Sequence, residues 1–157
     1  MMKYLISAFK FHQQLWAERL ITQLMQEAYS VQQPATLDCL MPVPLHWTRH
    51  FKRGFNQSIL LAQDLSSVTG MPYYDRVVHR SRRTVSQSKL AHKQRHKNVK
   101  NAFSLRDDLS QKHVIIVDDV MTTGTTVNEM AKELKIHGAL KVDVWCVARV
   151  SGSHPDF

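Results

Sequence analysis

The sequence contains only two cysteines, Cys39 and Cys146, among 157 residues. They lie far apart, each within an apolar stretch, so neither a zinc site nor a disulfide is expected. The longest apolar runs are too short to cross a hydrocarbon core of about 30 Å. No signal-peptide core follows the first residues. These absences predict a cytoplasmic protein with two buried thiols and no membrane insertion.

Acidic residues are also few, with 13 Asp and Glu against 21 Lys and Arg and a formal charge of +8. The imbalance is greatest between Arg80 and Asn101, where no acid occurs. A segment this basic and polar cannot bury itself, so we predict that it is mobile without a ligand. Basic surfaces attract nucleic acid, anionic lipid and phosphorylated metabolites by the same electrostatics, and charge alone leaves all three open.

The pattern of apolar residues predicts strands that alternate with helices, which is typical of an α/β domain with a parallel sheet. We expect one domain over residues 1–150, with helices on both faces of the sheet, an additional N-terminal helix packed on it, and a loose tail at 151–157. The expected helices are Tyr4 to Tyr29, a helix capped by Asn56 and ended by Gly70, and Thr125 to His137; the expected strands are Leu37 to Val43, Arg76 to His79, the run from Val114, and Lys141 to Arg149.

The run from Val114 to Thr126 is the most informative stretch. Its apolar half predicts a buried strand, and Asp118 and Asp119 follow where open α/β sheets bind their ligands. Gly124 permits a tight turn, and four threonines around it supply hydroxyl donors beside the start of a helix. Such a turn favours a phosphate, and the carboxylates favour hydroxyl groups or a divalent cation. Together they indicate a phosphorylated sugar with vicinal hydroxyls.

Other interpretations of this run are weaker. A Walker A loop requires Gly-Lys-Ser/Thr, which is absent, and a dinucleotide site requires several spaced glycines where only Gly124 occurs. A receiver domain also has paired aspartates after a strand, but it needs more βα units than the rest of the chain provides. An ordinary strand, turn and helix with exposed Asp and Thr side chains stays open as the alternative without function.

The run resembles the phosphoribosyl-pyrophosphate signature of type I phosphoribosyltransferases. The resemblance implies that Asp118 and Asp119 face the ribose 2′- and 3′-hydroxyls and act in catalysis. It implies that the 5′-phosphate is held by the loop of Thr122, Thr123, Gly124, Thr125 and Thr126. It also implies the type I phosphoribosyltransferase-like fold and Mg²⁺, possible near the two aspartates, although no direct protein ligand to a metal is assigned.

A second strand, loop and helix follows the expected strand that ends near Pro44. Arg49, Lys52 and Arg53 crowd the start of the next helix, where the helix dipole would favour acids. Cations at this place tend to need an anion between them and the helix, so we predict a pyrophosphate loop of Pro44, Arg49, Arg53 and Gly54. A solvated basic loop is the alternative.

Further motifs, in order along the chain, resemble the competence protein F (ComF/GntX) family. They are Pro-Val-Pro-Leu, Arg-Gly-Phe-Asn-Gln, Gln-Ser-Lys-Leu, Arg-His-Lys-Asn-Val and Ala-Phe, beginning at positions 42, 53, 87, 95 and 102. Members of this family are phosphoribosyltransferase-like proteins associated with DNA uptake and utilisation in bacteria. They commonly carry an N-terminal zinc ribbon, which two distant cysteines cannot form, so zinc is not expected in this chain. Both a natural short form and a truncated start stay open.

The resemblance to type I phosphoribosyltransferases implies that the segment 80–101 is a mobile lid, with Lys89 and Arg95 among the residues that would contact the leaving group. A surface that contacts nucleic acid is the alternative for this segment, and one segment could serve both purposes. The expected function is transfer of ribose 5-phosphate from phosphoribosyl pyrophosphate, or binding of a related sugar phosphate, with a nitrogen acceptor that the sequence does not identify. The alternatives are a non-catalytic competence factor that binds single-stranded DNA or a DNA-processing protein, and a regulator that senses the sugar phosphate.

Overall fold

The structure is a computed structural model that describes residues 15–32, 37–45, 55–80 and 100–149. Its elements, in chain order, are α2 (Leu15–Gln32), β1 (Cys39–Pro42), α4 (Gln57–Thr69), β2 (Val78–Arg80), β3 (Phe103–Leu105), β4 (His113–Met121), α6 (Thr125–Ile136) and β5 (Lys141–Arg149).

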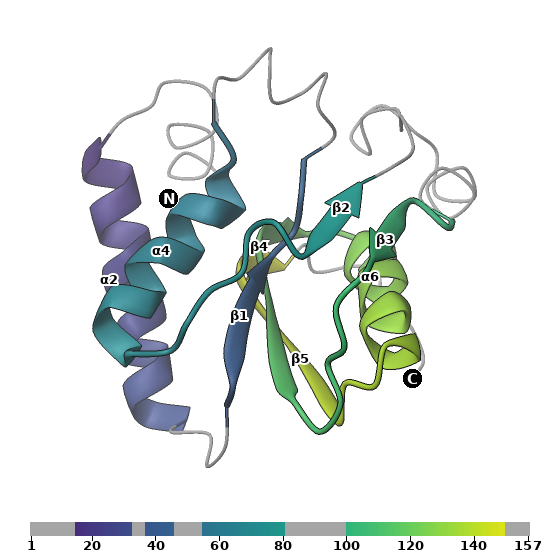
Figure 1. Cartoon of the computed structure of the whole chain (residues 1–157). Helices are drawn as coiled ribbons and strands as arrows, with labels where there is room; N and C mark the ends of the chain where they lie inside the picture. Colours follow the sequence, from purple (N-terminus) through teal and green to yellow (C-terminus); the bar gives the residue numbers. More distant parts are fainter. Residues whose placement is uncertain (1–14, 33–36, 46–54, 81–99, 150–157) are drawn as a thin grey trace.

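The main sheet of the described residues has three parallel strands in the order β1-β4-β5 (Figure 1). Leu40 of β1 lies opposite Ile115 of β4, and Ile115 lies opposite Asp143 of β5. At the amino end of the sheet, the backbone N–H of His113 donates to Asp38 Oδ2 at 2.6 Å and its carbonyl accepts from the N–H of Asp38 at 3.0 Å. Because β4 is central, its backbone is paired with a parallel strand on both edges.

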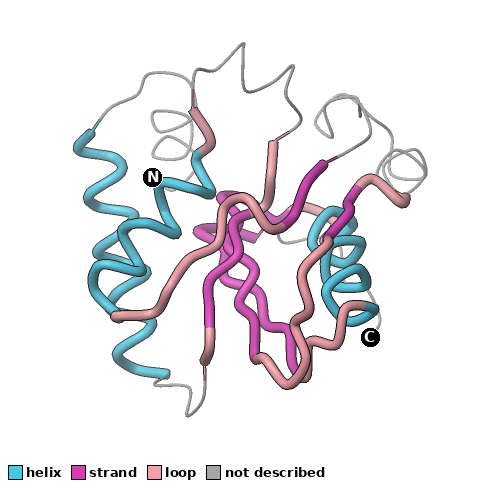
Figure 2. The backbone as a smooth tube through the Cα atoms, viewed as in Figure 1, coloured by secondary structure: helices cyan, strands magenta, loops and turns pink. Residues whose placement is uncertain are grey.

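Helices cover both faces of this sheet, as Figure 2 shows in cyan on either side of the magenta strands. Alternate side chains of a strand point to opposite faces. Ile115 therefore packs with Ile21 of α2 and Leu61 of α4, whereas its neighbour Ile116 packs with Met130 of α6. The expected α/β architecture with a parallel sheet and helices on both faces is confirmed.

The structure adds a two-stranded antiparallel sheet, β2-β3, that the alternating pattern did not predict. Arg80 lies opposite Phe103, and its guanidinium carbon lies 5.4 Å from the centroid of that ring. Val78, Phe103 and Leu105 are buried in the cluster on the α6 side of the sheet. Arg80, the first residue of the predicted lid, thus belongs to a strand. Three-residue strands are too short for their pairing to be visible in the sequence.

The predicted boundaries differ from the observed ones in a few places. The short strand expected at Arg76 to His79 begins two residues later, at Val78. The N-terminal helix continues to Gln32, and its predicted start at Tyr4 lies outside the described residues. The last strand and the cap residues of α4, Asn56 and Gly70, are as predicted. Helix and strand ends depend on tertiary contacts, which a periodic pattern does not contain.

Candidate functional site

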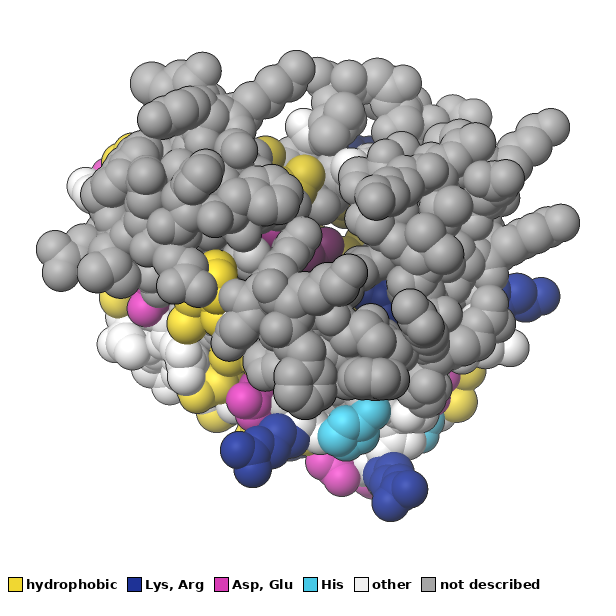
Figure 3. Space-filling view, turned by 90° about the horizontal axis from the view of Figure 1, so that it is seen from above, with side chains coloured by type: hydrophobic (Ala, Val, Ile, Leu, Met, Phe, Trp, Pro, Cys, Tyr) yellow, Lys and Arg dark blue, Asp and Glu magenta, His cyan; other side chains and the backbone are white. Residues whose placement is uncertain are grey.

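Two strand-to-helix crossings, from β1 to α4 and from β4 to α6, lie at the same edge of the main sheet. Because β1 and β4 are parallel, their carboxyl ends point the same way, towards the top of Figure 1. The N–H of Val43 donates to the carbonyl of Val117 at 2.9 Å. This hydrogen bond holds the end of β1 beside Val117, the last apolar residue of β4 before Asp118. Ligands of open α/β sheets bind at this edge. Figure 3 looks down on it and shows acidic side chains near the centre of the face.

The two acidic residues lie in the last part of β4, where burial changes from complete to partial. Val114 to Val117 are fully buried, and Asp118 and Asp119 are half-buried. Asp118 Oδ1 accepts a hydrogen bond from the N–H of Asp119 at 2.9 Å, and Asp119 Oδ1 accepts one from the N–H of Val120 at 2.6 Å. Each carboxylate is therefore held close to its own backbone, which reduces the freedom it must lose when a ligand binds.

The first crossing contributes a hydroxyl to this pair. Ser58 lies in the first turn of α4, and its Oγ lies 3.4 Å from Asp118 Oδ1, a long hydrogen bond between residues 60 positions apart. Asn56 holds this turn in place, because its Oδ1 accepts from the N–H of Ser58 at 3.1 Å and its Nδ2 donates to the carbonyl of Val43 at 3.0 Å. Ser58 was not among the site residues predicted from the sequence.

The second crossing is the hydroxyl-rich turn. Gly124 has a φ of +72°, the left-handed conformation that favours glycine, and α6 begins at the next residue. No side-chain cap hydrogen bond closes this start of α6, although all residues of the turn are described. Thr123 Oγ1 and Thr125 Oγ1 lie 2.7 Å apart, and every residue from Thr122 to Thr126 is half-buried. A helix start with flanking hydroxyls is a favourable place for a phosphate.

Cys146 is a further neighbour of the acid pair, because β5 places it opposite Asp118. Burial raises the pKa of the Cys146 thiol, and the charge of Asp118 raises it further. Burial raises the pKa of Cys39 to about 11. Both cysteines are free; Cys39 is buried as predicted, whereas Cys146 is only half-buried. Since raised pKa values disfavour the thiolate, neither thiol is suited to act as a nucleophile.

The structure places some predicted site residues together and leaves others outside its description. Asp118, Asp119 and the turn from Thr122 to Thr126 form one continuous edge, and Pro44 lies at the exit of β1 beside it. The other predicted residues, Arg49, Arg53, Gly54, Lys89 and Arg95, lie outside the described residues. Ser58 and Cys146 could have been proposed from the predicted parallel sheet, because strand ends and helix starts at one edge of such a sheet are neighbours.

The oxygen donors of this edge are compatible with Mg²⁺. Mg²⁺ usually takes one or two protein carboxylates and completes its shell with water and substrate phosphates. Asp118 and Asp119 provide such carboxylates next to a turn suited to a phosphate. Within the described ranges, no group of three or more His, Cys, Asp or Glu side chains could hold a metal ion by itself. A Mg²⁺ ion held by Asp118 and Asp119 would complete its shell with water and with oxygens of a bound phosphate.

A sequence family supports the same interpretation. The profile of the family described as "Phosphoribosyl transferase domain" matches residues 56–155. The chain belongs to this family. The match includes α4, both acidic residues and the whole hydroxyl turn, so it covers the two crossings that form the edge.

Relatives and solved structures agree with this assignment. Competence protein F from Haemophilus influenzae (strain ATCC 51907 / DSM 11121 / KW20 / Rd) is 38% identical over 152 residues, which is 92% of this chain and 66% of that protein. DNA utilization protein YhgH from Escherichia coli (strain K12) is 46% identical over 112 residues, 71% of this chain and 49% of the relative. The resemblance to the competence protein F family is confirmed. The chain spans about half to two thirds of the length of these relatives.

A purine phosphoribosyltransferase from Pyrococcus horikoshii Ot3 has a similar fold, with a TM-score of 0.55, 22% identity, and coverage of 91% of this chain and 80% of that one. The predicted type I phosphoribosyltransferase-like fold is confirmed. None of the helices in the described part of the chain has the length and apolar character needed to cross a membrane.

Proposed function

We propose that this protein binds phosphoribosyl pyrophosphate with Mg²⁺ and transfers ribose 5-phosphate to a nitrogen acceptor, with release of pyrophosphate. The observation that carries the proposal is the continuity of Asp118 and Asp119 with the turn around Gly124 at one sheet edge. A ribose bearing a 5′-phosphate matches this edge, because its hydroxyls fit carboxylate acceptors and its phosphate fits an uncapped helix start.

In this reaction the lone pair of the acceptor nitrogen forms a bond to the anomeric carbon while the bond from that carbon to the pyrophosphate oxygen breaks. The electrons of the broken bond leave with pyrophosphate, and a proton on the acceptor nitrogen passes to water. Positive charge develops on the ribose ring, as in glycoside hydrolysis. Asp118 and Asp119 would hold the ring hydroxyls and stabilise this charge. Mg²⁺, when bound, would supply positive charge to the leaving group.

Residues outside the described ranges complete the proposal. The pyrophosphate would lie at the loop that contains Arg49, Arg53 and Gly54, after Pro44. Arg80 of the predicted lid 80–101 lies in β2, so residues 81–99 would close over the pyrophosphate and contribute Lys89 and Arg95. We also propose that residues 1–150 form one domain. A cytoplasmic location is supported by two free cysteines, which are typical of reducing compartments.

The replacement Asp118→Asn tests this function. It removes the negative charge but keeps the shape of the side chain, so we expect phosphoribosyl pyrophosphate to bind about tenfold or more weakly in calorimetry and pyrophosphate release to be lost. Asp108→Asn is the matched control, because Asp108 is an exposed carboxylate that accepts hydrogen bonds from Ser110, and Ser110 lies near the amino end of the sheet, opposite the turn. Equal affinity of parent and Asp118→Asn would refute the assignment.

The names of the relatives and the formal charge of +8 favour a second candidate function, binding of single-stranded DNA without catalysis. The two functions respond differently to salt. Neutralised phosphates release counterions, so DNA affinity should fall steeply between about 50 and 200 mM salt. A sugar phosphate site should instead require Mg²⁺ and prefer the pyrophosphorylated sugar over free phosphate. Titrations of oligonucleotide and of phosphoribosyl pyrophosphate over the same salt series separate the two.

A further inference from the structure

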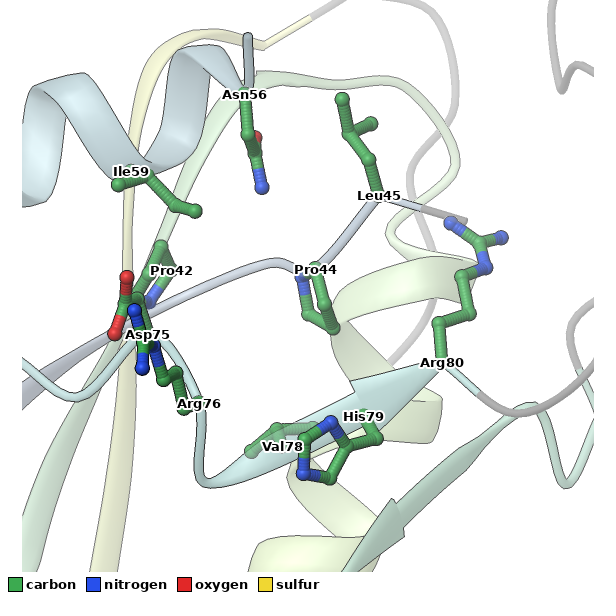
Figure 4. A pocket seen from close by; sticks show the side chains of 10 residues that line it. All are labelled: Pro42, Pro44, Leu45, Asn56, Ile59, Asp75, Arg76, Val78, His79 and Arg80. Carbon is green, nitrogen blue, oxygen red and sulfur yellow. The ribbon is translucent and has the colours of Figure 1, made fainter. Parts of the chain in front are cut away.

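The two outer strands of the main sheet, β1 and β5, differ in what covers their outer edge. The segment after α4 runs along β1, where the N–H of Leu40 donates to the carbonyl of Pro72 and its carbonyl accepts from the N–H of Tyr74, both at 2.9 Å. Asp75 continues this segment and lines a cavity together with Pro42 at the end of β1 (Figure 4). The chain itself therefore covers the outer edge of β1.

The outer edge of β5 lacks such a cover. Within the described ranges, no backbone segment pairs with the side of β5 that faces away from β4. The strand has nine residues without proline or glycine, and it keeps one register with β4 from Lys141 to Arg149, so no bulge bends its edge away. Proteins usually shield such an edge with a short strand, a proline, a bulge or a covering segment, because its N–H and C=O groups attract another strand.

The side chains of β5 suit the interior of a wider sheet. The run from Val144 to Ala148 is apolar, and each of its residues is half-buried. Val142 and Val144 pack on the α6 side of the sheet, and on the α2 side the rings of Trp145 and Tyr29 lie 5.4 Å apart. Since helices cover both faces of the strand, we attribute its incomplete burial to the outer edge.

A second copy of the chain can cover this edge. Two copies that pair through the same strand around a two-fold axis run antiparallel, and such closed symmetry is the commonest form of oligomer. Opposite residues of an antiparallel pair point to the same face, so their two numbers must both be odd or both be even. Each possible register is therefore centred on one residue of β5.

The charges of β5 favour the register that is centred on Cys146. In this register Asp143 lies opposite Arg149 of the second copy, and the symmetry forms this pair twice. Trp145 lies opposite Val147 of the second copy. Opposite charges and pairs of an aromatic with a β-branched side chain are both favourable neighbours across strands.

Other registers fit less well. An axis at Trp145 would place Lys141 opposite Arg149, and like charges directly opposite each other are destabilising. An axis at Val144 would place Asp143 opposite Trp145 and would form no pair of opposite charges. An axis nearer to either end of β5 would shorten the paired stretch.

Both charged side chains of the favoured register are accessible to a second copy. Arg149 is exposed, and 38% of the Asp143 side chain is exposed. His113 and Lys141 both contact Oδ2 of Asp143, at 2.8 and 3.0 Å. An arginine of the second copy would therefore approach Oδ1.

We propose that this protein forms a two-fold symmetric dimer in which the β5 strands of two copies pair antiparallel around Cys146. The main sheets of the two copies join into one continuous sheet, and Arg149 of each copy pairs with Asp143 of the other. Arg149 lies opposite Met121 of β4, so the paired stretch reaches the carboxyl edge that carries the acid pair. The inference does not depend on the proposed function.

Sedimentation velocity of the full chain over a concentration series tests the dimer. Arg149→Glu places like charges at both ends of the paired stretch, so we expect it to weaken the dimer about tenfold or more, whereas Arg149→Lys should preserve it. Arg106→Glu is the matched control, because Arg106 is exposed and lies outside the main sheet. A monomer at every concentration, or equal dissociation constants for the parent and a folded Arg149→Glu, would overturn the inference. Thermal unfolding verifies that each variant is folded.

A cross-link through Cys146 tests the register. Cα atoms of opposite residues in an antiparallel pair lie about 4.5–5.5 Å apart, a separation that a disulfide can span. Copper(II) phenanthroline should therefore join two copies, with two thiol protons released and two electrons passed to copper(II). The reaction is run at alkaline pH, because burial raises the pKa of this thiol. Cys39 is fully buried and should not react, so Cys146→Ser should abolish the covalent dimer.

A shifted thiol is the control for the register. Cys146→Ser combined with Ala148→Cys moves the thiol by two residues, and two such thiols would lie about 13 Å apart along the strands in the proposed dimer. This variant should dimerise without forming a disulfide. Absence of a cross-link in the parent dimer, or an equal yield from the shifted thiol, would show that the copies meet in another register or through another surface, and the inference would be wrong.

Discussion

The two crossings at the carboxyl edge of the sheet differ in how each helix begins. At the start of α4, Asn56 satisfies a backbone N–H and a backbone carbonyl with its own side chain. At the start of α6, Gly124 has no side chain, and no side-chain cap hydrogen bond is formed there. A side chain caps the start of α4, whereas no side chain caps the start of α6, where the positive end of the helix dipole lies beside the hydroxyls of the turn.

In the proposed function, this difference gives the α4 turn a structural role and the α6 turn a binding role at the same edge. The α4 turn fixes the wall of the site and places Ser58 beside Asp118. The α6 turn offers the amides and hydroxyls that a phosphate would contact. Substitutions at α4 should therefore change stability first, and substitutions at α6 should change ligand binding first.

Asn56→Ala should have the largest effect on stability. It removes the cap of α4 and leaves the N–H of Ser58 and the carbonyl of Val43 without this partner in a buried place. We expect a loss of about 2–3 kcal/mol in the free energy of unfolding, measured by urea denaturation. Asn56→Asp separates the two contacts, because it keeps the cap oxygen but loses the donor to the carbonyl of Val43, so it should recover only part of the loss. A loss below about 0.5 kcal/mol for Asn56→Ala would show that the side-chain cap does not stabilise the start of α4, and the two crossings would then not differ in how their helix starts are stabilised.

A matched pair of glycines tests the second crossing. Gly124 and Gly70 have φ values of +72° and +73°, and a Cβ would have only ordinary contacts at Gly124 and none within 4 Å at Gly70. Either glycine replaced by alanine should cost about 1–2 kcal/mol of stability, from the left-handed backbone alone. Only Gly124→Ala should also weaken binding of phosphoribosyl pyrophosphate in calorimetry. Parallel losses of affinity in both variants would contradict a special role of the α6 turn.

Ser58→Ala should have a smaller effect, because its hydrogen bond to Asp118 is long. We expect a loss of less than about 1 kcal/mol in stability. The same variant should reduce ligand affinity if Ser58 orients Asp118, and calorimetry measures this. Ser67→Ala is the control, because Ser67 is exposed on the same helix and its Oγ donates to the carbonyl of Gln63. A similar effect of both serines would show that the contact between the crossings carries no binding energy.

Substitutions at the amino end of the sheet, opposite the candidate site, should have the smallest effect on stability. They also test whether the two ends of the sheet act independently. Burial raises the pKa of Asp143, but hydrogen bonds from Lys141 and His113 outweigh it, so the pKa lies below its ordinary value. A lowered pKa in the folded state stabilises the protein above the ordinary value, near pH 4, and this contribution is lost as the pH falls below it. Because 38% of the Asp143 side chain is exposed, Asp143→Asn should cost less than about 1 kcal/mol at pH 7.

This loss should shrink when unfolding is measured near pH 3, where the parent carboxylate begins to be protonated. Affinity for phosphoribosyl pyrophosphate should not change in Asp143→Asn, since Asp143 lies near the amino end of β5. A change in affinity would show that the two ends of the sheet are coupled. Ligand affinity would then depend on more than the two helix starts at the carboxyl edge.

Much of the fold could be predicted from local patterns. The buried run before Asp118 and the alternation of strands with helices indicated a parallel sheet, and the cap residues Asn56 and Gly70 gave the limits of α4. These signals are local, because hydrogen bonds of caps and burial of whole runs depend on near neighbours in sequence. The pairing of β2 with β3 was missed, since two three-residue strands separated by a long segment leave no such signal.

The sequence alone determined which chemical groups are present and in what order: two carboxylates, a glycine with left-handed backbone and a set of hydroxyls before a helix. The tertiary structure decided which distant groups join them. Ser58 and Cys146 lie near Asp118, and Arg80 lies across from Phe103, only because sheet register and helix packing bring them there. These contacts span many residues of chain, and local periodicity contains no information about register between separate elements.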